Sequence, residues 1–106
     1  MSTVHEISES NFDVVVDGSD SLFLVEFWGS WCGPCKTMLT LLEGLAKDEA
    51  IPFSVGKIEI GQNPQLASRF GVMTVPTFIT FQNGEPVARH SGAASRTDLV
   101  SLVDVR

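Results

Sequence analysis

The sequence lacks features that several classes of protein require. It has only two cysteines, too few for a framework of disulfides. It has no basic, apolar start of the kind that directs secretion, and no later apolar run approaches the length of a membrane span. With a net charge of −6 it also lacks the basic patches that nucleic acids attract. We therefore expect a soluble, cytoplasmic protein that binds neither nucleic acid nor membrane.

What is present suits one globular domain. The chain has 106 residues, of which 43% are hydrophobic and 19% are charged. This length is sufficient to bury a core but too short to divide into two domains. No internal repeat, low-complexity segment or linker-like stretch interrupts it. We expect residues 1–106 to form a single domain, and because nothing argues for an oligomer we expect a monomer.

Hydrophobic patterns predict strands and helices in alternation. The predicted strands are 3–7, 21–28, 53–60, 77–81 and 86–90, and the predicted helices are 8–18, 34–50, one from 64 and one from about 95. Ser8 or Ser10, Asn63 and Ser95 are expected to cap three of these helices. Strands separated by helices favour parallel pairing, and the Asn-Gly hairpin adds an antiparallel edge. The predicted class is α/β, a mixed sheet in the order βαβαβαββα with helices on both faces.

Both cysteines lie in the stretch WCGPCK, where a helix is predicted to begin. Their spacing lets the two sulfurs meet with little backbone movement, so the pair can cycle between dithiol and disulfide. Cys32 would face the free N–H groups and positive dipole of the helix start, which stabilise a thiolate. Cys35, one turn further in, should be less exposed and less acidic. Pro34 stiffens the turn, Gly33 lets a partner chain approach closely, and Trp31 would form a flat apolar rim.

One acid stands inside the apolar run SLFLVEFW. Burying Glu26 in its ionised form is unfavourable, so burial would raise its pKa into the range that a proton shuttle near neutral pH requires. The alternative is an ordinary acid on a solvated strand face. The sequence leaves both interpretations open.

The motif and its surroundings resemble the thioredoxin family. WCGPCK follows the strand LFLVEFW and precedes both TVPT and the Asn-Gly hairpin, so that the resemblance covers nearly the whole chain. It implies the thioredoxin fold and an enzyme that reduces protein disulfides. In such an enzyme Cys32 attacks the substrate and Cys35 resolves the mixed disulfide. No bound cofactor is implied, because the disulfide-containing protein is reduced by the thiols themselves and the oxidised pair is returned to dithiol by thioredoxin reductase, a flavin enzyme linked to NADPH or ferredoxin.

The same resemblance implies a surface that binds substrate. It places Pro76 beside the cysteines as a cis-proline, with the backbone of Thr74 and Val75 pairing with an extended substrate segment. Gly92, in HSGA, matches a small residue on this surface, where a side chain would obstruct a partner. Trp31, Gly33 and Pro34 would complete the surface around the attacking cysteine.

The resemblance also assigns a role to Glu26. Thioredoxins hold a buried Asp at this position, which assists deprotonation of the resolving cysteine, and Lys57 matches a lysine adjacent to that acid. If the two pair, Lys57 would lower the pKa that burial raises, and the sequence does not decide which effect is larger. Taken by itself, Lys57 is an ordinary solvated lysine. A further departure from the family is Thr40, where a proline usually stands inside the second helix.

Other functions remain open. The two cysteines could supply half of a zinc site, with His5 and His90 as nitrogen donors, or Cys32 and His90 could serve a hydrolase. The chain could also be a scaffolding subunit or a redox switch with little reductase activity. A thiol oxidase or isomerase is disfavoured, because Gly-Pro between the cysteines resembles the reducing members of the superfamily.

Overall fold

Strands and helices alternate along residues 3–104, which are the residues described by this computed structural model. The elements are β1 (Val4–Glu6), the π-helical turn η1 (Asp13–Asp17), β2 (Phe23–Trp28), α1 (Gly33–Lys47), β3 (Ser54–Glu59), α2 (Pro64–Arg69), β4 (Thr77–Gln82), β5 (Glu85–Ser91) and α3 (Arg96–Leu102). This order confirms the predicted βαβαβαββα. None of these helices is long and apolar enough to cross a membrane.

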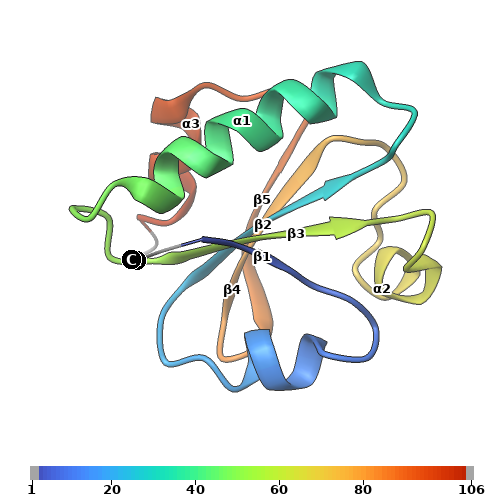
Figure 1. Cartoon of the computed structure of the whole chain (residues 1–106). Helices are drawn as coiled ribbons and strands as arrows, with labels where there is room; N and C mark the ends of the chain where they lie inside the picture. The colour runs from blue at the N-terminus through green and yellow to red at the C-terminus, as the bar shows by residue number, and fades with distance from the viewer. Residues whose placement is uncertain (1–2, 105–106) are drawn as a thin grey trace.

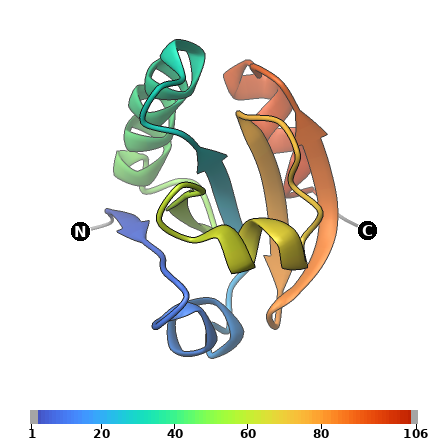
Figure 2. The same cartoon turned by 90° about the vertical axis from the view of Figure 1, so that its right-hand side faces the viewer.

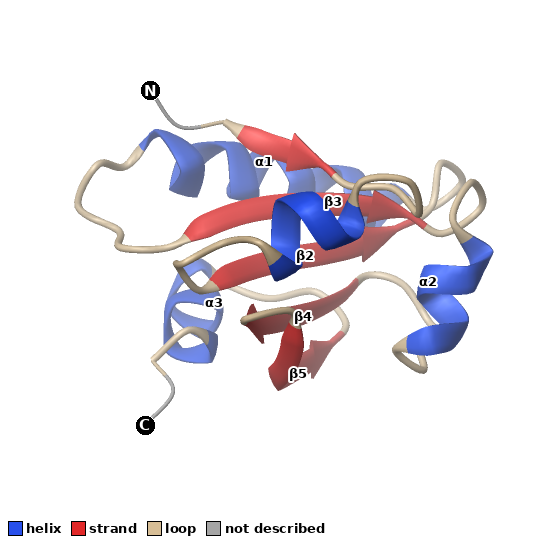
Figure 3. Ribbon diagram, turned by 90° about the horizontal axis from the view of Figure 1, so that it is seen from below, coloured by secondary structure: helices blue, strands red, loops and turns tan. Residues whose placement is uncertain are grey.

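The five strands form one mixed sheet in the order β1-β3-β2-β4-β5 (Figure 3). Both β1 and β2 pair parallel with β3, whereas β4 runs antiparallel to β2 and β5 antiparallel to β4. The prediction that strands separated by helices pair in parallel is therefore wrong for β4. The connecting helix α2 has 6 residues and spans about 9 Å, too short to return the chain along a strand of about 20 Å.

Helices cover both faces of the sheet. The ribbon places α1 and α3 on one face and η1 and α2 on the other (Figure 1, Figure 2). Along β2 the side chains alternate: Phe23 and Phe27 pack in the core under η1 and α2, while Leu24 packs in the core under α1 and α3. By the same alternation Glu26 lies on the face that α1 covers.

The first predicted helix is much shorter than expected. The structure has only the π-helical turn Asp13–Asp17, closed by the Gly18 N–H donating to the Asp13 carbonyl at 3.1 Å. Neither predicted serine caps it, since Phe12 occupies the N-cap position and makes no side-chain hydrogen bond there. A single turn suffices to bury Phe12 and Val16 against the sheet.

The cap of α2 also differs from the prediction. Asn63 stands at the N-cap position, but its side chain accepts the Glu9 N–H at 2.9 Å and donates to the Glu59 carbonyl at 2.9 Å. The carboxylate of Glu9 instead accepts the Gln65 N–H at 2.6 Å. An acid more than fifty positions away thus caps this helix, which a local sequence pattern cannot reveal.

The capping box at α3 is confirmed. The Asp98 N–H donates to Ser95 Oγ at 3.0 Å, and the Ser95 N–H donates to Asp98 Oδ2 at 3.0 Å. We expect Ser95→Ala to lower the free energy of unfolding by about 1 kcal/mol, measured by chemical denaturation. Ser101→Ala, in the same helix away from the cap, is the matched control and should not destabilise. Equal stability of both variants would contradict a stabilising cap.

Candidate active site

The turn between β2 and α1 holds Cys32 at the start of the helix. The Cys32 N–H donates to the Gly29 carbonyl at 3.0 Å, and Cys32 is the N-cap residue of α1. The ring of Trp31 folds back over Gly29, where a Cβ atom would lie 2.6 Å from a ring carbon. Gly29 therefore permits the tight turn, while Trp31 remains 66% exposed.

The two sulfurs differ in exposure as the sequence predicts. Cys32 and Cys35 form a disulfide with their Cα atoms 5.3 Å apart. Cys32 is 8% exposed, whereas Cys35 is completely buried. The Cys35 N–H donates to Cys32 Sγ at 3.2 Å, so the outer sulfur already accepts a hydrogen bond from the first turn of α1. A donor in this position would stabilise a thiolate on Cys32.

A second segment lies against the outer cysteine. The Val75–Pro76 peptide bond is cis, as the resemblance implied, and the Val75 carbonyl oxygen lies 3.8 Å from Cys32 Sγ. The hydroxyl of Thr77 donates to the Thr74 carbonyl at 2.7 Å and the Gly92 N–H to the Pro76 carbonyl at 2.8 Å. The structure thus brings the segment before β4 and the end of β5 to the cysteine turn.

Much of the surface around Cys32 is open. Gly33, Pro34 and Thr74 are exposed, while Pro76 is buried. Apart from each glycine itself, its chain neighbours and, for Gly33, its own helix backbone, no atom lies within 4 Å of the Cβ position at Gly33 or Gly92. Gly92 has a φ of +94°. A partner backbone can therefore approach the sulfur from this side.

Glu26 is buried rather than solvated. Its side chain is 0% exposed, and neither carboxylate oxygen has a hydrogen-bond partner among the residues the structure describes. Glu26 is paired in register with Lys57 on β3 and with Phe78 on β4. Burial raises the pKa of Glu26 to about 8, and the charge of the half-buried Lys57 lowers that pKa by a smaller amount. The sequence left open whether Glu26 is buried or lies on a solvated strand face, and the structure shows that it is buried.

Glu26 and the inner cysteine occupy the same layer of the molecule. Cys35, Met38 and Leu42 follow one another at helical spacing on the buried side of α1. The ribbon shows α1 covering one face of the sheet (Figure 1), and its buried side packs with Leu24, which lies on the same face of β2 as Glu26. The layer between α1 and β2 therefore contains a protonatable carboxyl and the buried sulfur of Cys35.

Two features of the site escape prediction from sequence. The guanidinium of Arg89 on β5 donates to the carbonyls of Phe70 and Gly71, which fixes the segment leading to Pro76. Met73, in the same segment, is 91% exposed. Nothing local to Arg89 indicates its partners, because they lie 18 and 19 positions away. The sequence also does not predict that Met73 is exposed, because methionine side chains are usually buried.

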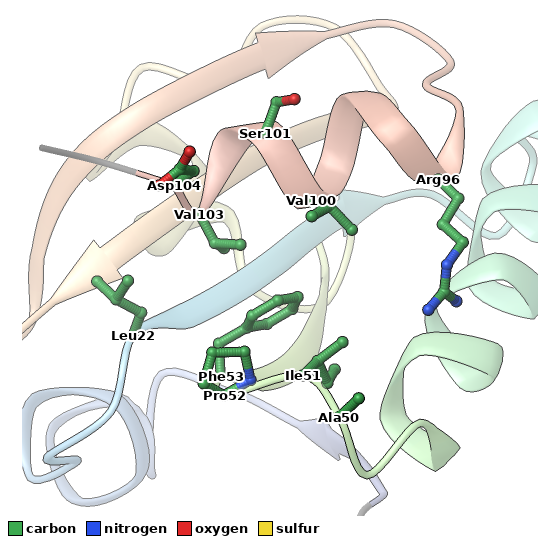
Figure 4. Close-up of a pocket in the computed structure, with 10 residues that line it drawn as sticks. All are labelled: Leu22, Ala50, Ile51, Pro52, Phe53, Arg96, Val100, Ser101, Val103 and Asp104. Carbon is green, nitrogen blue, oxygen red and sulfur yellow. The ribbon is translucent and has the colours of Figure 1, made fainter.

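Each histidine contacts residues other than the cysteines, and the pocket lies at the far end of β2 from them. His90 Nε2 lies 3.1 Å from the Ala93 carbonyl oxygen, and the His5 ring is tilted against Phe23. Within residues 3–104 no three His, Cys, Asp or Glu side chains are grouped so that they could hold a metal ion. A pocket of about 500 Å³ lies beside Leu22, at the end of β2 opposite to the cysteines, with apolar walls and Arg96 at its rim (Figure 4).

Comparison with known proteins decides the family. A family model for Thioredoxin matches residues 3–105. The chain belongs to the thioredoxin family. It is 36% identical over 104 residues to a thioredoxin of Buchnera aphidicola, covering 98% of this chain and 96% of that protein. It is 38% identical over 100 residues to a thioredoxin of Alicyclobacillus acidocaldarius, covering 93% and 94%.

Two further relatives extend this result. A bifunctional thioredoxin reductase/thioredoxin of Mycobacterium leprae is 39% identical over 101 residues, which are 94% of this chain and 22% of that protein. The solved structure of a mutant thioredoxin from Halobacterium salinarum superposes with a TM-score of 0.86 at 32% identity, covering 96% of this chain and 88% of that one. The predicted thioredoxin fold is confirmed. Together with the Cys32–Cys35 disulfide, membership of the thioredoxin family makes this chain a thiol-disulfide oxidoreductase.

Proposed function

We propose that this oxidoreductase works in the cytoplasm as a reductant of disulfides in other proteins, with Cys32 as nucleophile. The observation that carries the proposal is the contrast between the two sulfurs, since Cys32 is 8% exposed and accepts a backbone N–H at 3.2 Å, whereas Cys35 is fully buried. The Cys32 thiolate attacks a substrate sulfur, and the other substrate sulfur leaves as a thiol. Cys35 then attacks Cys32 Sγ and releases the second thiol. Two electrons pass to the substrate and the Cys32–Cys35 disulfide forms.

Glu26 is proposed to take the proton of Cys35 during the second step. The buried thiol must lose its proton before it attacks, and no solvent reaches it. A carboxyl with a pKa of about 8 exchanges protons readily near neutral pH, and it lies in the same layer as Cys35. Lys57, the register neighbour of Glu26, is proposed to stabilise the carboxylate while it is ionised. The glutamate would thus fill the role of the family's aspartate.

The open surface around Cys32 is proposed to bind the substrate. An extended segment of the partner would form backbone hydrogen bonds with Thr74 and Val75 beside Pro76. Trp31, with Gly33 and Pro34, would provide an apolar rim and close access to the sulfur. The docking surface is therefore defined as Trp31, Gly33, Pro34, Thr74, Val75, Pro76 and Gly92.

A side chain at Gly92 tests the docking surface. We expect Gly92→Asn to raise KM for a protein disulfide such as insulin about tenfold, while reduction of a small aromatic disulfide changes less than about twofold. Asparagine is chosen because it tolerates positive φ better than most residues. Gly71→Asn is the matched control, since Gly71 has a φ of +66° and open space around its Cβ position. Equal KM values for the two variants would remove Gly92 from the docking surface.

The oxidised pair is proposed to be reduced again by a flavin-dependent thioredoxin reductase that draws on NADPH or ferredoxin. The relative in Mycobacterium leprae supports this partner, because its name joins a thioredoxin reductase and a thioredoxin in one chain. No cofactor need bind this chain itself, since the electrons arrive and leave through the two sulfurs.

A further inference from the structure

Met73 is an exposed apolar residue close to the redox site. Its side chain is 91% exposed, the largest exposed fraction among the bulky apolar side chains of residues 3–104. It stands two positions before Val75, whose carbonyl oxygen lies 3.8 Å from Cys32 Sγ. Because two residues span at most about 7 Å, any protein docked on Cys32 comes within reach of Met73.

The backbone that carries Met73 is held on both sides. On one side the buried Val72 donates its N–H to the Ala67 carbonyl at 2.8 Å, and Arg89 binds the carbonyls of Phe70 and Gly71. On the other side the Thr77 hydroxyl donates to the Thr74 carbonyl at 2.7 Å. The thioether thus projects from a fixed segment. The backbone under this apolar contact needs no further ordering when a partner docks, so the entropy lost there is that of the flexible Met73 side chain.

The other described methionine is protected. Met38 is 9% exposed, and its Sδ accepts the Ala94 N–H at 3.4 Å. In the disulfide form the two cysteine sulfurs are bonded to each other and have no thiolate to react. Within residues 3–104, Met73 is therefore the thioether that a peroxide in solution reaches most readily.

We propose that Met73 is a site of oxidation by peroxides, and that its sulfoxide weakens the docking of protein substrates that present an apolar side chain beside their disulfide. The sulfur of Met73 attacks one oxygen of the peroxide, the O–O bond breaks, and an S–O bond forms. Sulfur loses two electrons, and the peroxide is reduced to water or an alcohol. The apolar contact becomes polar, while Cys32 and Cys35 keep their chemistry. The inference rests on the proposed docking surface.

The test begins with the disulfide form of the full chain. It is treated with hydrogen peroxide, freed of peroxide, reduced with a dithiol, and assayed with insulin and with a small aromatic disulfide. Peptide mass spectrometry measures sulfoxide separately at Met1, Met38 and Met73. We expect Met73 to be oxidised well before Met38. We expect KM for insulin to rise about fivefold to tenfold while the small disulfide changes less than about twofold.

Met73→Leu supplies the decisive comparison, since it retains Met1 and Met38 but has no thioether at position 73. Each protein is compared with itself before and after peroxide, so a different starting KM does not matter. The rise in KM should be absent from Met73→Leu, and in the wild type a methionine sulfoxide reductase should reverse it. An equal rise in both proteins, or full sulfoxide at Met73 with unchanged KM, would overturn the inference.

The Gly92→Asn variant separates this inference from the proposed function. If Gly92→Asn raises KM for insulin and the Met73 sulfoxide does not, the proposed docking surface is supported, and the proposal that oxidation of Met73 weakens docking is wrong. If neither change affects KM, the docking surface itself is wrong and the inference falls with it.

Discussion

A Cys35→Ser variant in its reduced form should remain covalently attached to its protein substrate, whereas a Cys32→Ser variant should form no adduct. In the proposed mechanism the fully buried Cys35 releases the substrate, so its removal should leave the mixed disulfide on Cys32 unresolved. Loss of either sulfur should reduce turnover by at least about a thousandfold, as expected when one member of a catalytic unit is removed. Intact mass spectrometry under non-reducing conditions would detect the adduct.

The control for the two cysteine variants is the double variant, which should neither turn over nor form an adduct. Both single variants should unfold reversibly, at denaturant concentrations similar to each other. Such a result would show that they lose activity because a reacting sulfur is missing and not because the fold is lost. Normal turnover by Cys35→Ser would contradict the two-cysteine mechanism. Adducts formed by Cys32→Ser would reverse the roles of the two sulfurs.

Glu26→Gln should become progressively more stable than the wild type as pH rises. The pKa of Glu26 is about 8 in the folded protein against an ordinary value of 4.5. Below pH 4.5 the acid is neutral in both states. Between pH 4.5 and about 8 only the unfolded chain ionises, so the free energy of unfolding of the wild type falls. At about 1.4 kcal/mol per pKa unit, the loss is roughly 5 kcal/mol by pH 8.

This experiment uses the disulfide form, in which the cysteines do not titrate. The difference in free energy of unfolding between the two proteins is measured by chemical denaturation from pH 4 to pH 9. Burying the amide of glutamine lowers the free energy of unfolding of the variant by the same amount at every pH. It therefore shifts the measured difference but does not change how that difference varies with pH. Glu43→Gln, the same change at an exposed position on α1, is the matched control. A difference independent of pH would mean that Glu26 ionises normally.

The same Glu26→Gln variant, in its dithiol form, should resolve mixed disulfides more slowly, because no carboxylate takes the Cys35 proton. The pH dependence of this step should also lose its inflection near pH 8. Rapid-mixing kinetics with a pre-formed mixed disulfide on Cys32 would measure the step directly. An unchanged pH profile would remove Glu26 from the mechanism while leaving the stability prediction standing.

Local patterns in the sequence predict local structure well. The capping box of Ser95 and Asp98, the Asn83-Gly84 hairpin and the helix starting around Pro34 all depend on residues close together in the chain. The failures involve distant partners. Asn63 binds Glu9 instead of capping α2, and β4 runs antiparallel because α2 is too short to reverse the chain's path.

The functional site likewise has features that local patterns predict and features that depend on residues distant in the chain. Motif and spacing place Cys32 and Cys35, since a helix beginning between them orders the two sulfurs by depth. The ionisation of Glu26 depends instead on how completely α1 and the sheet exclude water, and on whether Lys57 reaches it. A strand pattern cannot supply that balance, because both effects act through space.

The most direct test of a reducing function is the equilibrium reduction potential of the Cys32–Cys35 couple, measured against a glutathione buffer. If the chain donates electrons to protein disulfides in the cytoplasm, its potential should lie below about −260 mV, the lower end of the extracted cytosolic glutathione range. At equilibrium in a glutathione buffer poised within that range, the Cys32–Cys35 pair would then be largely in its disulfide form. A potential near or above about −220 mV would contradict the account and indicate an oxidising or isomerising role.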